Sequence, residues 1–234
     1  MIREKTVSLV IPVLNEEQGL EKMLPHLPSG IDEVIIVDGG SKDKTVEVAQ
    51  KYGATVLVQK TKGYGAAYFE GFAAAKGEII ATVDGDATYP LNSIPHMVEW
   101  LVDRKYIFVS GSRFPLSNMM SMHQRNFIGN MVVTTLTSFL FRTKVVDVNS
   151  GMWVFYKSFL EKPKFISDAW NLSLEIKIEA ICQKGGVFIE YPINYFERLG
   201  ESKVVRPWRT GFKSLFFLAA KKWQVMGRSR RGEI

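Results

Sequence analysis

Short runs of aliphatic and β-branched residues alternate with amphipathic stretches through the first half of the chain. Such runs, when glycine and polar residues bound them, predict strands. The predicted strands cover residues 7–13, 33–38, 55–58, 78–84 and 107–111. Because strands that alternate with helices form mostly parallel sheets, we expect a doubly wound α/β fold in this half.

Apolar residues spaced three and four apart predict helices between these strands. The predicted helices cover residues 20–27, 42–52, 65–76 and 94–101. We expect Pro25 to shorten the first helix, Ser41 to cap the N-terminus of the second, and Gly77 to end the third.

The second half of the chain has a different order of elements. The pattern predicts a helix over residues 125–142, a strand over 152–156, a helix over 172–184, a pair of short strands over 187–190 and 192–196, and a tail from residue 204. The tail mixes aromatic residues with lysines and arginines, which is typical of a helix at a membrane surface with a polybasic end. A solvated helix that packs on its own domain has the same pattern.

Composition and charge narrow the class of protein. Of the 234 residues, 46% are hydrophobic and 12% aromatic, which excludes an intrinsically disordered chain. The single cysteine, Cys182, excludes a disulfide framework. Residues 1–5 lead directly into the first strand, so we expect no signal peptide, and the longest apolar stretch, 127–141, is too short and too polar to span a bilayer. The formal net charge of +6 favours an anionic partner.

Ligand-type residues follow three of the predicted parallel strands. The segments that end these strands are residues 11–17, 37–45 and 83–88. Ligands of open parallel sheets bind at this edge. Asp84 and Asp86 form the sharpest pair, because Gly85 between them allows the turn that brings two carboxylates together. Such a pair suits a hard divalent cation that also binds a diphosphate.

Several later motifs follow these strand ends in a characteristic order. They are Gly111-Ser112-Arg113-Phe114, Arg125, Asp147-Val148-Asn149-Ser150-Gly151, Glu190-Tyr191-Pro192-Ile193 and Arg198-Leu199-Gly200-Glu201-Ser202-Lys203. Together with the strand ends, this set resembles the dolichyl-phosphate (polyprenyl-phosphate) mannose synthases and their glucosyl relatives, within family 2 of the glycosyltransferases. The resemblance covers residues 6–204, and the ordered set is far more specific than any one of its members.

The resemblance implies an inverting transfer of a hexose, mannose first and glucose next, from GDP-mannose or UDP-glucose to a polyprenyl (dolichyl) phosphate. It implies one catalytic domain of the GT-A type over residues 1–204, followed by a basic amphipathic tail over 205–234. Within the domain, residues 1–112 correspond to the half that binds the nucleotide sugar and 113–204 to the half that binds the acceptor.

The resemblance also assigns roles to individual residues. The positions that bind the nucleotide sugar are Pro12, Glu16, Asp38 and Asp84, and those that bind Mg²⁺ or Mn²⁺ are Asp84 and Asp86. The positions near the acceptor phosphate are Arg113, Arg125, Arg198, Ser202 and Lys203. The catalytic residues are Asp86, Arg113, Arg125 and Asp147. This chain departs from the family pattern at Gly39, where many relatives have a second aspartate, at Gly85, where alanine is usual, and at Thr88, where some relatives have a glutamine that ligates the metal.

The acceptor decides between two mechanisms. A phosphate monoester is already largely a dianion at neutral pH, because its second pKa is about 6, so it needs no general base. A sugar hydroxyl needs a carboxylate base within hydrogen-bond reach. Asp147 is the candidate base, although it is equally suited to anchoring a loop.

Other classes of function fit the sequence less well. Residues 84–88 match the D-x-D-x-T turn of haloacid-dehalogenase-type phosphatases, but that fold opens with this strand and requires a later acidic motif that the chain lacks. A non-catalytic basic adaptor is opposed by the presence of Asp38, Asp84 and Asp86. Nucleic acid is not expected as a partner, since the chain has no aromatic stacking motif of the RRM type.

The resemblance and the charge together predict where the protein works. We expect a cytoplasmic protein, bound peripherally to the cytoplasmic face of a membrane through its amphipathic and basic segments or through an integral membrane partner.

Overall fold

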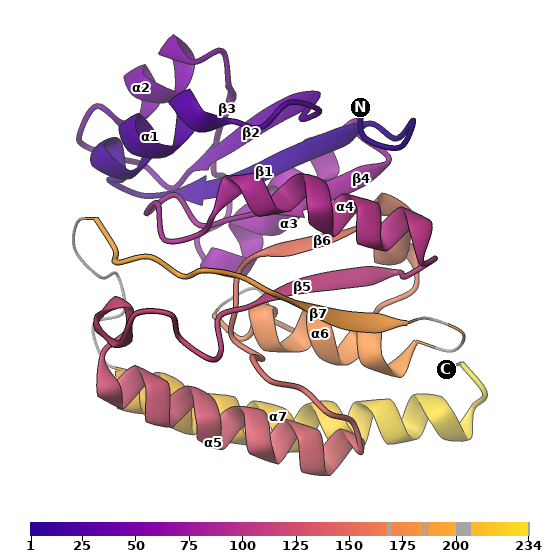
Figure 1. Ribbon diagram of the computed structural model, residues 1–234. Coiled ribbons are helices and arrows are strands. Elements are labelled where there is room, and N and C mark those ends of the chain that lie inside the picture. Colours follow the sequence, from indigo (N-terminus) through magenta and orange to yellow (C-terminus); the bar gives the residue numbers. More distant parts are fainter. Residues whose placement is uncertain (168–169, 184, 186, 200–206, 234) are drawn as a thin grey trace.

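A seven-stranded sheet forms the centre of the computed structural model, which describes residues 1–167, 170–183, 185, 187–199 and 207–233 (Figure 1). The strands are β1 (Val7–Val13), β2 (Glu33–Asp38), β3 (Thr55–Val58), β4 (Ile79–Thr82), β5 (Phe108–Ser112), β6 (Trp153–Tyr156) and β7 (Phe188–Pro192). Their order in the sheet is β3-β2-β1-β4-β6-β5-β7. All neighbouring pairs are parallel except those that β6 makes with β4 and β5. The α/β fold with a mostly parallel sheet is therefore confirmed.

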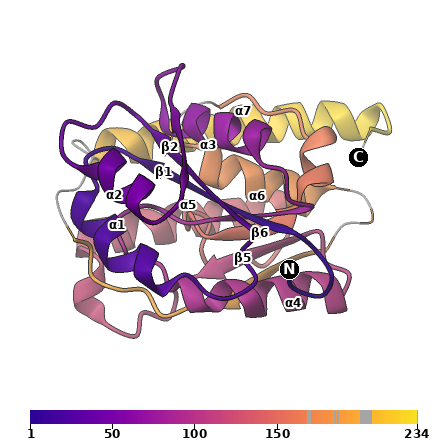
Figure 2. The ribbon, with the colours of Figure 1, turned by 90° about the horizontal axis from the view of Figure 1, so that it is seen from above.

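Helices cover both faces of the sheet. They are α1 (Glu17–Met23), α2 (Thr45–Lys51), α3 (Tyr64–Ala74), α4 (Ile94–Asp103), α5 (Gln124–Phe141), α6 (Leu172–Cys182) and α7 (Pro207–Arg230), with short 3-10 turns at Leu24–His26, Leu91–Ser93, Met119–Ser121 and Lys157–Glu161. Helices α1, α2 and α4 pack on one face and α3 and α6 on the other (Figures 1 and 2). Helices α5 and α7 form a further layer outside α6.

Strand alternation explains why both faces are covered. Along β1, Leu9 and Ile11 pack in the core beneath α1 and α4, whereas Val10 packs in the core beneath α3. All three side chains are fully buried. Helix α3 can approach β1 closely because Gly71 has no Cβ atom, which at this position would lie 2.4 Å from the Cγ1 atom of Val10.

Helix α7 is joined to α6 by buried ion pairs as well as by apolar contacts. Lys221 lies 2.7 Å from Glu175 and 2.6 Å from Glu179, and Arg228 lies 2.6 Å from Glu179. These four side chains are nearly or fully buried. Part of the basic character of the tail is thus used inside the protein. None of the helices in the described ranges has the combination of length and apolar character needed to cross a bilayer.

Two local predictions were wrong. Ser41 does not cap α2: its hydroxyl donates to Asp38 (2.5 Å) and accepts from the backbone N–H of Asn15 (2.8 Å), and α2 begins at Thr45. The strand pair over 187–190 and 192–196 does not form either. One residue between two strands is too short for a hairpin, for which two-residue loops are the common short form. Instead β7 continues along the open edge of β5, parallel to it.

Candidate active site

The polar segments after β1, β2 and β4 meet at one edge of the sheet, because these strands are parallel neighbours. Asp38 ends β2, and its carboxylate accepts hydrogen bonds from the backbone N–H groups of Gly40 (3.1 Å) and Ser41 (3.1 Å). Pro12, on β1, pairs with Val37 of β2. The residues expected to line the nucleotide site therefore lie on adjacent strands.

Arg198 joins the ends of β1 and β4. Its Nη2 atom lies 2.5 Å from Oε1 of Glu16, and its Nη1 atom lies 2.8 Å from Oδ2 of Asp86. The other oxygen of Asp86 accepts a hydrogen bond from the hydroxyl of Thr88 (2.7 Å). The segment that carries Arg198 follows β7 along this edge, where Phe196 donates to the carbonyl of Thr88 (2.9 Å). The structure thus brings Glu16, Asp86 and Arg198 together, and the partly exposed guanidinium of Arg198 is bound to both carboxylates.

Asp84 is held by two tyrosines from the start of α3. Oδ1 of Asp84 accepts from the hydroxyls of Tyr64 (2.9 Å) and Tyr68 (3.2 Å). Burial, with a further contribution from the charge of Asp86, raises the pKa of Asp84 to about 6. A bound cation would relieve the repulsion between these two buried carboxylates.

Tyr64 and Tyr68 were not identified from the sequence. Their spacing of four residues at the start of a helix that follows β3 was the available signal, because residues i and i+4 lie on one helix face. The position facing them, Gly151, leaves little room for a side chain. A Cβ atom at Gly151 would lie 3.0 Å from Oδ2 of Asp84 and 3.0 Å from the hydroxyl of Tyr64.

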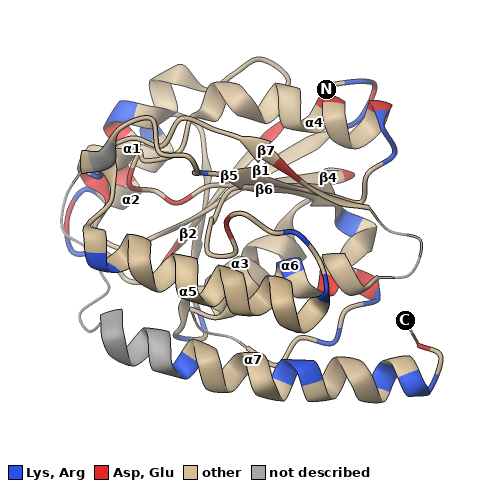
Figure 3. Ribbon diagram, turned by 60° about the horizontal axis from the view of Figure 1, so that its bottom comes forward, with Lys and Arg blue, Asp and Glu red and all other residues tan. Residues whose placement is uncertain are grey.

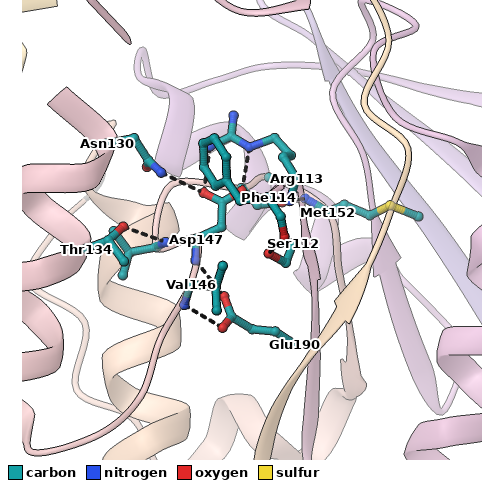
Figure 4. Close-up of polar contacts among 12 residues, drawn as sticks. Ser112, Arg113, Phe114, Asn130, Thr134, Val146, Asp147, Met152 and Glu190 are labelled. Atoms are coloured by element: carbon teal, nitrogen blue, oxygen red, sulfur yellow. Dashed lines mark hydrogen bonds and ion pairs between the residues drawn. The ribbon is translucent and has the colours of Figure 1, made fainter. Parts of the chain in front are cut away.

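Arg113 and Asp147 form a buried bidentate ion pair beside this site (Figure 4). The Nε atom of Arg113 donates to Oδ2 of Asp147 (2.6 Å) and its Nη2 atom to Oδ1 (2.8 Å). The backbone N–H of Arg113 (3.1 Å) and the side-chain amide of Asn130 (3.2 Å) also donate to this carboxylate. Burial alone would raise the pKa of Asp147, but the charge and hydrogen bonds of Arg113 and the charge of Lys177 together hold that pKa below its usual value.

Two further charged side chains fix the loop that carries Asp147. The carboxylate of Glu190 accepts from the backbone N–H groups of Val146 (2.7 Å) and Asp147 (2.8 Å), as Figure 4 shows. On the other side, Nζ of Lys177 donates to the carbonyl of Asp147 (2.7 Å), and burial lowers the pKa of Lys177 to about 7. With every side of Asp147 engaged, the geometry favours an anchoring role for this residue over that of a general base.

The other predicted acceptor residues lie in different surroundings. Arg125 is an exposed residue in the first turn of α5. This turn adjoins Arg113, since the ring of Phe127 lies 5.4 Å from that of Phe114. Ser202 and Lys203 lie outside the described residues.

Comparison with known proteins identifies the family. Residues 8–162 match the sequence profile of "Glycosyl transferase family 2". A dolichyl-phosphate hexose transferase from Haloferax volcanii is 33% identical over 201 residues, which are 85% of this chain and 86% of that protein. The low-salt glycan biosynthesis hexosyltransferase Agl6 of the same organism is 29% identical over 211 residues, 85% of this chain but only 50% of the relative.

The solved structures agree in fold. Glucosyl-3-phosphoglycerate synthase from Mycobacterium tuberculosis, in complex with Mn²⁺, UDP-glucose and phosphoglyceric acid, superposes with a TM-score of 0.71. It is 21% identical, and the match covers 94% of this chain and 80% of that one. The α/β architecture, the order of the ligand-type strand ends and the sequence match lead to one conclusion: the chain belongs to glycosyl transferase family 2.

Proposed function

We propose that this glycosyltransferase moves a hexose from a nucleoside diphosphate sugar to a polyprenyl phosphate. The observation that carries the proposal is the buried Arg113–Asp147 pair. Because Asp147 is bound to Arg113, the carboxylate that a hydroxyl acceptor would use as its base is engaged. A phosphate acceptor needs no base but does need nearby cations, since its dianion must approach a donor diphosphate.

The donor would lie across the ends of β2, β1 and β4. Asp38, Pro12 and Glu16 face the nucleoside in this arrangement, and Asp84 and Asp86 the diphosphate. The described residues contain no cluster of three His, Cys, Asp or Glu side chains placed for a metal. Two carboxylates are nevertheless sufficient for Mg²⁺ or Mn²⁺, which bind phosphate and water oxygens as their remaining ligands. A divalent cation at this place neutralises the charge that develops on the leaving diphosphate.

We propose that Arg113 and Arg125 bind the acceptor phosphate. Ser202 and Lys203 are proposed to bind it too, although they lie outside the described residues. Arg113 is held rigidly by Asp147, whereas Arg125 is exposed and able to follow the acceptor. Arg198 lies on the donor side in this structure and must release Oδ2 of Asp86 before that oxygen binds a cation. The matched relative named as a dolichyl-phosphate hexose transferase supports this class of acceptor. Mannose from GDP-mannose is the first candidate donor, and glucose from UDP-glucose the second.

A lipid acceptor calls for a membrane surface, and α5 and α7 supply the side chains for it. Large apolar residues are exposed on both helices: Ile128, Met131, Val132, Leu136, Phe139, Phe216, Trp223 and Met226. Basic residues lie along α7, which runs beside α5 (Figure 3). Exposed apolar side chains beside lysines and arginines bind the interface of anionic membranes. We propose a peripheral position on the cytoplasmic face, alone or with an integral membrane partner.

A transfer assay tests the proposal. The protein is incubated with Mg²⁺, a polyprenyl phosphate and labelled GDP-mannose or UDP-glucose in parallel, and lipid-extractable label is measured. One donor should give product with the wild type and with Asp103→Ala, a control in an exposed acidic residue of α4, but not with Asp86→Ala. Metal-dependent donor binding without a lipid product would refute the acceptor and direct the search to sugar hydroxyls.

A further inference from the structure

An exposed tryptophan lies at the rim of the candidate site. Trp170 precedes α6, and 44% of its surface is exposed. Its ring stacks on that of Tyr64, with the centroids 4.6 Å apart and the planes 13° from parallel. The hydroxyl of Tyr64 donates to Asp84 (2.9 Å). Trp170 is thus one aromatic ring away from a carboxylate of the donor site.

The order of the strands locates this aromatic pair along the active-site edge. Asp38 and Glu16 follow β2 and β1, Asp84 follows β4, and Arg113 follows β5. Strand β6 lies between β4 and β5. If the diphosphate of the donor lies at Asp84 and the acceptor phosphate lies at Arg113, the sugar that is transferred between them must lie at the beginning of β6.

Tyr64 and Trp170 lie beside the beginning of β6. Trp153, the first residue of β6, packs against Tyr68 with ring centroids 5.0 Å apart, and Tyr68 packs edge-on against Tyr64 at 5.0 Å. Gly151, just before β6, is the residue that faces both Asp84 and Tyr64. The aromatic pair therefore borders the position expected for the sugar, on the α3 and α6 side of the sheet.

We infer that Trp170, supported by Tyr64, is a specificity-determining wall against which the transferred hexose lies. This inference rests on the proposed function and assigns the sugar subsite within it. A pyranose ring has an apolar C–H face and a polar rim. The flat indole ring matches that face, and the stacking of Trp170 on Tyr64 places the indole beside Asp84, where the diphosphate is proposed to lie. The nucleoside is not the proposed partner of Trp170, since the proposed function assigns it to the ends of β1 and β2, on the other side of β4.

The experiment compares ligands with and without the sugar. The affinities of wild type, Trp170→Ala and Trp170→Phe are measured by titration with the nucleoside diphosphate sugar and with the matching nucleoside diphosphate, both with Mg²⁺. Asp103→Ala is the control, because Asp103 is an exposed residue at the C-terminal end of α4 and has no part in the proposed site. The unchanged binding of the nucleoside diphosphate also shows that a variant is folded.

Trp170→Ala should bind the nucleotide sugar about tenfold more weakly than the wild type, with unchanged affinity for the nucleoside diphosphate. Trp170→Phe should retain most of the affinity, and Asp103→Ala all of it. Equal losses for both ligands would overturn the inference, because Trp170 would then only position Asp84. An unchanged affinity of Trp170→Ala for the nucleotide sugar would also overturn it, because Trp170 would then not contact the hexose. A wild-type protein that binds neither donor would refute the proposed function itself, and this inference with it.

Discussion

Replacing Asp147 by asparagine separates the anchoring role of this residue from that of a base. Asparagine keeps the shape of the side chain but removes its charge. Its NH2 group would also face an N–H group of Arg113 or Asn130, and two donors cannot hydrogen-bond to each other. Asp147 is fully buried and accepts hydrogen bonds from Arg113 and Asn130. The side chain of Arg113, which is 9% exposed, would be left without a counter-charge.

The loss of free energy of unfolding should be large. Removing one partner of a buried ion pair costs about 3–5 kcal/mol, a substantial part of the roughly 5–15 kcal/mol that stabilises a domain. At about 2–4 °C per kcal/mol for a domain of this size, the Tm should fall by roughly 6–20 °C. The matched control is Asp103→Asn, whose exposed pair with Arg3 should contribute no more than about 1 kcal/mol.

Urea unfolding in a double-mutant cycle measures the interaction free energy between Arg113 and Asp147. Asp147→Asn, Arg113→Met and the double variant are compared with the wild type, and the double variant should lose less than the sum of the two single losses. Additive losses would refute the reasoning, and so would a free energy of unfolding of Asp147→Asn within about 0.5 kcal/mol of that of the wild type. In that case a normal Tm combined with a lost kcat would restore Asp147 as a general base.

Three further predictions concern the donor side. Asp86→Ala should abolish transfer while the protein stays folded, so wild-type turnover would contradict the role given to Asp86. Because burial and the charge of Asp86 raise the pKa of Asp84 to about 6, and a cation binds the deprotonated form, Mg²⁺-dependent donor binding should weaken as the pH falls through 6. An affinity that stays constant from about pH 5 to 7.5 would contradict this competition. Gly151→Ala should raise the donor KM without unfolding the protein, because its Cβ would lie 3.0 Å from Asp84 and from the hydroxyl of Tyr64; an unchanged KM would show that Asp84 moves freely.

Hydrophobic periodicity determined most of the elements, because the choice between strand and helix depends on which neighbouring side chains must be buried together. The bounds predicted for β1, β2 and β3 match the structure. The carboxylates at the strand ends could also be identified from the sequence, because the hydrophobic pattern shows where the strands end. The sequence places Asp38, Asp84 and Asp86 after buried runs, and parallel strands carry such residues to one edge.

The partners of these residues depended on the tertiary structure. Arg198 binds Glu16 across 182 positions of sequence, and Arg113 binds Asp147 across 34. The neighbour of β7 was likewise chosen by the open edge of β5 rather than by the residues of β7 themselves. Local pattern determines what a segment forms and which chemistry it carries. The pairing of strands and the packing of helices against the sheet decide which buried charges meet. Burial leaves a polar group no partner other than the one that the fold brings to it.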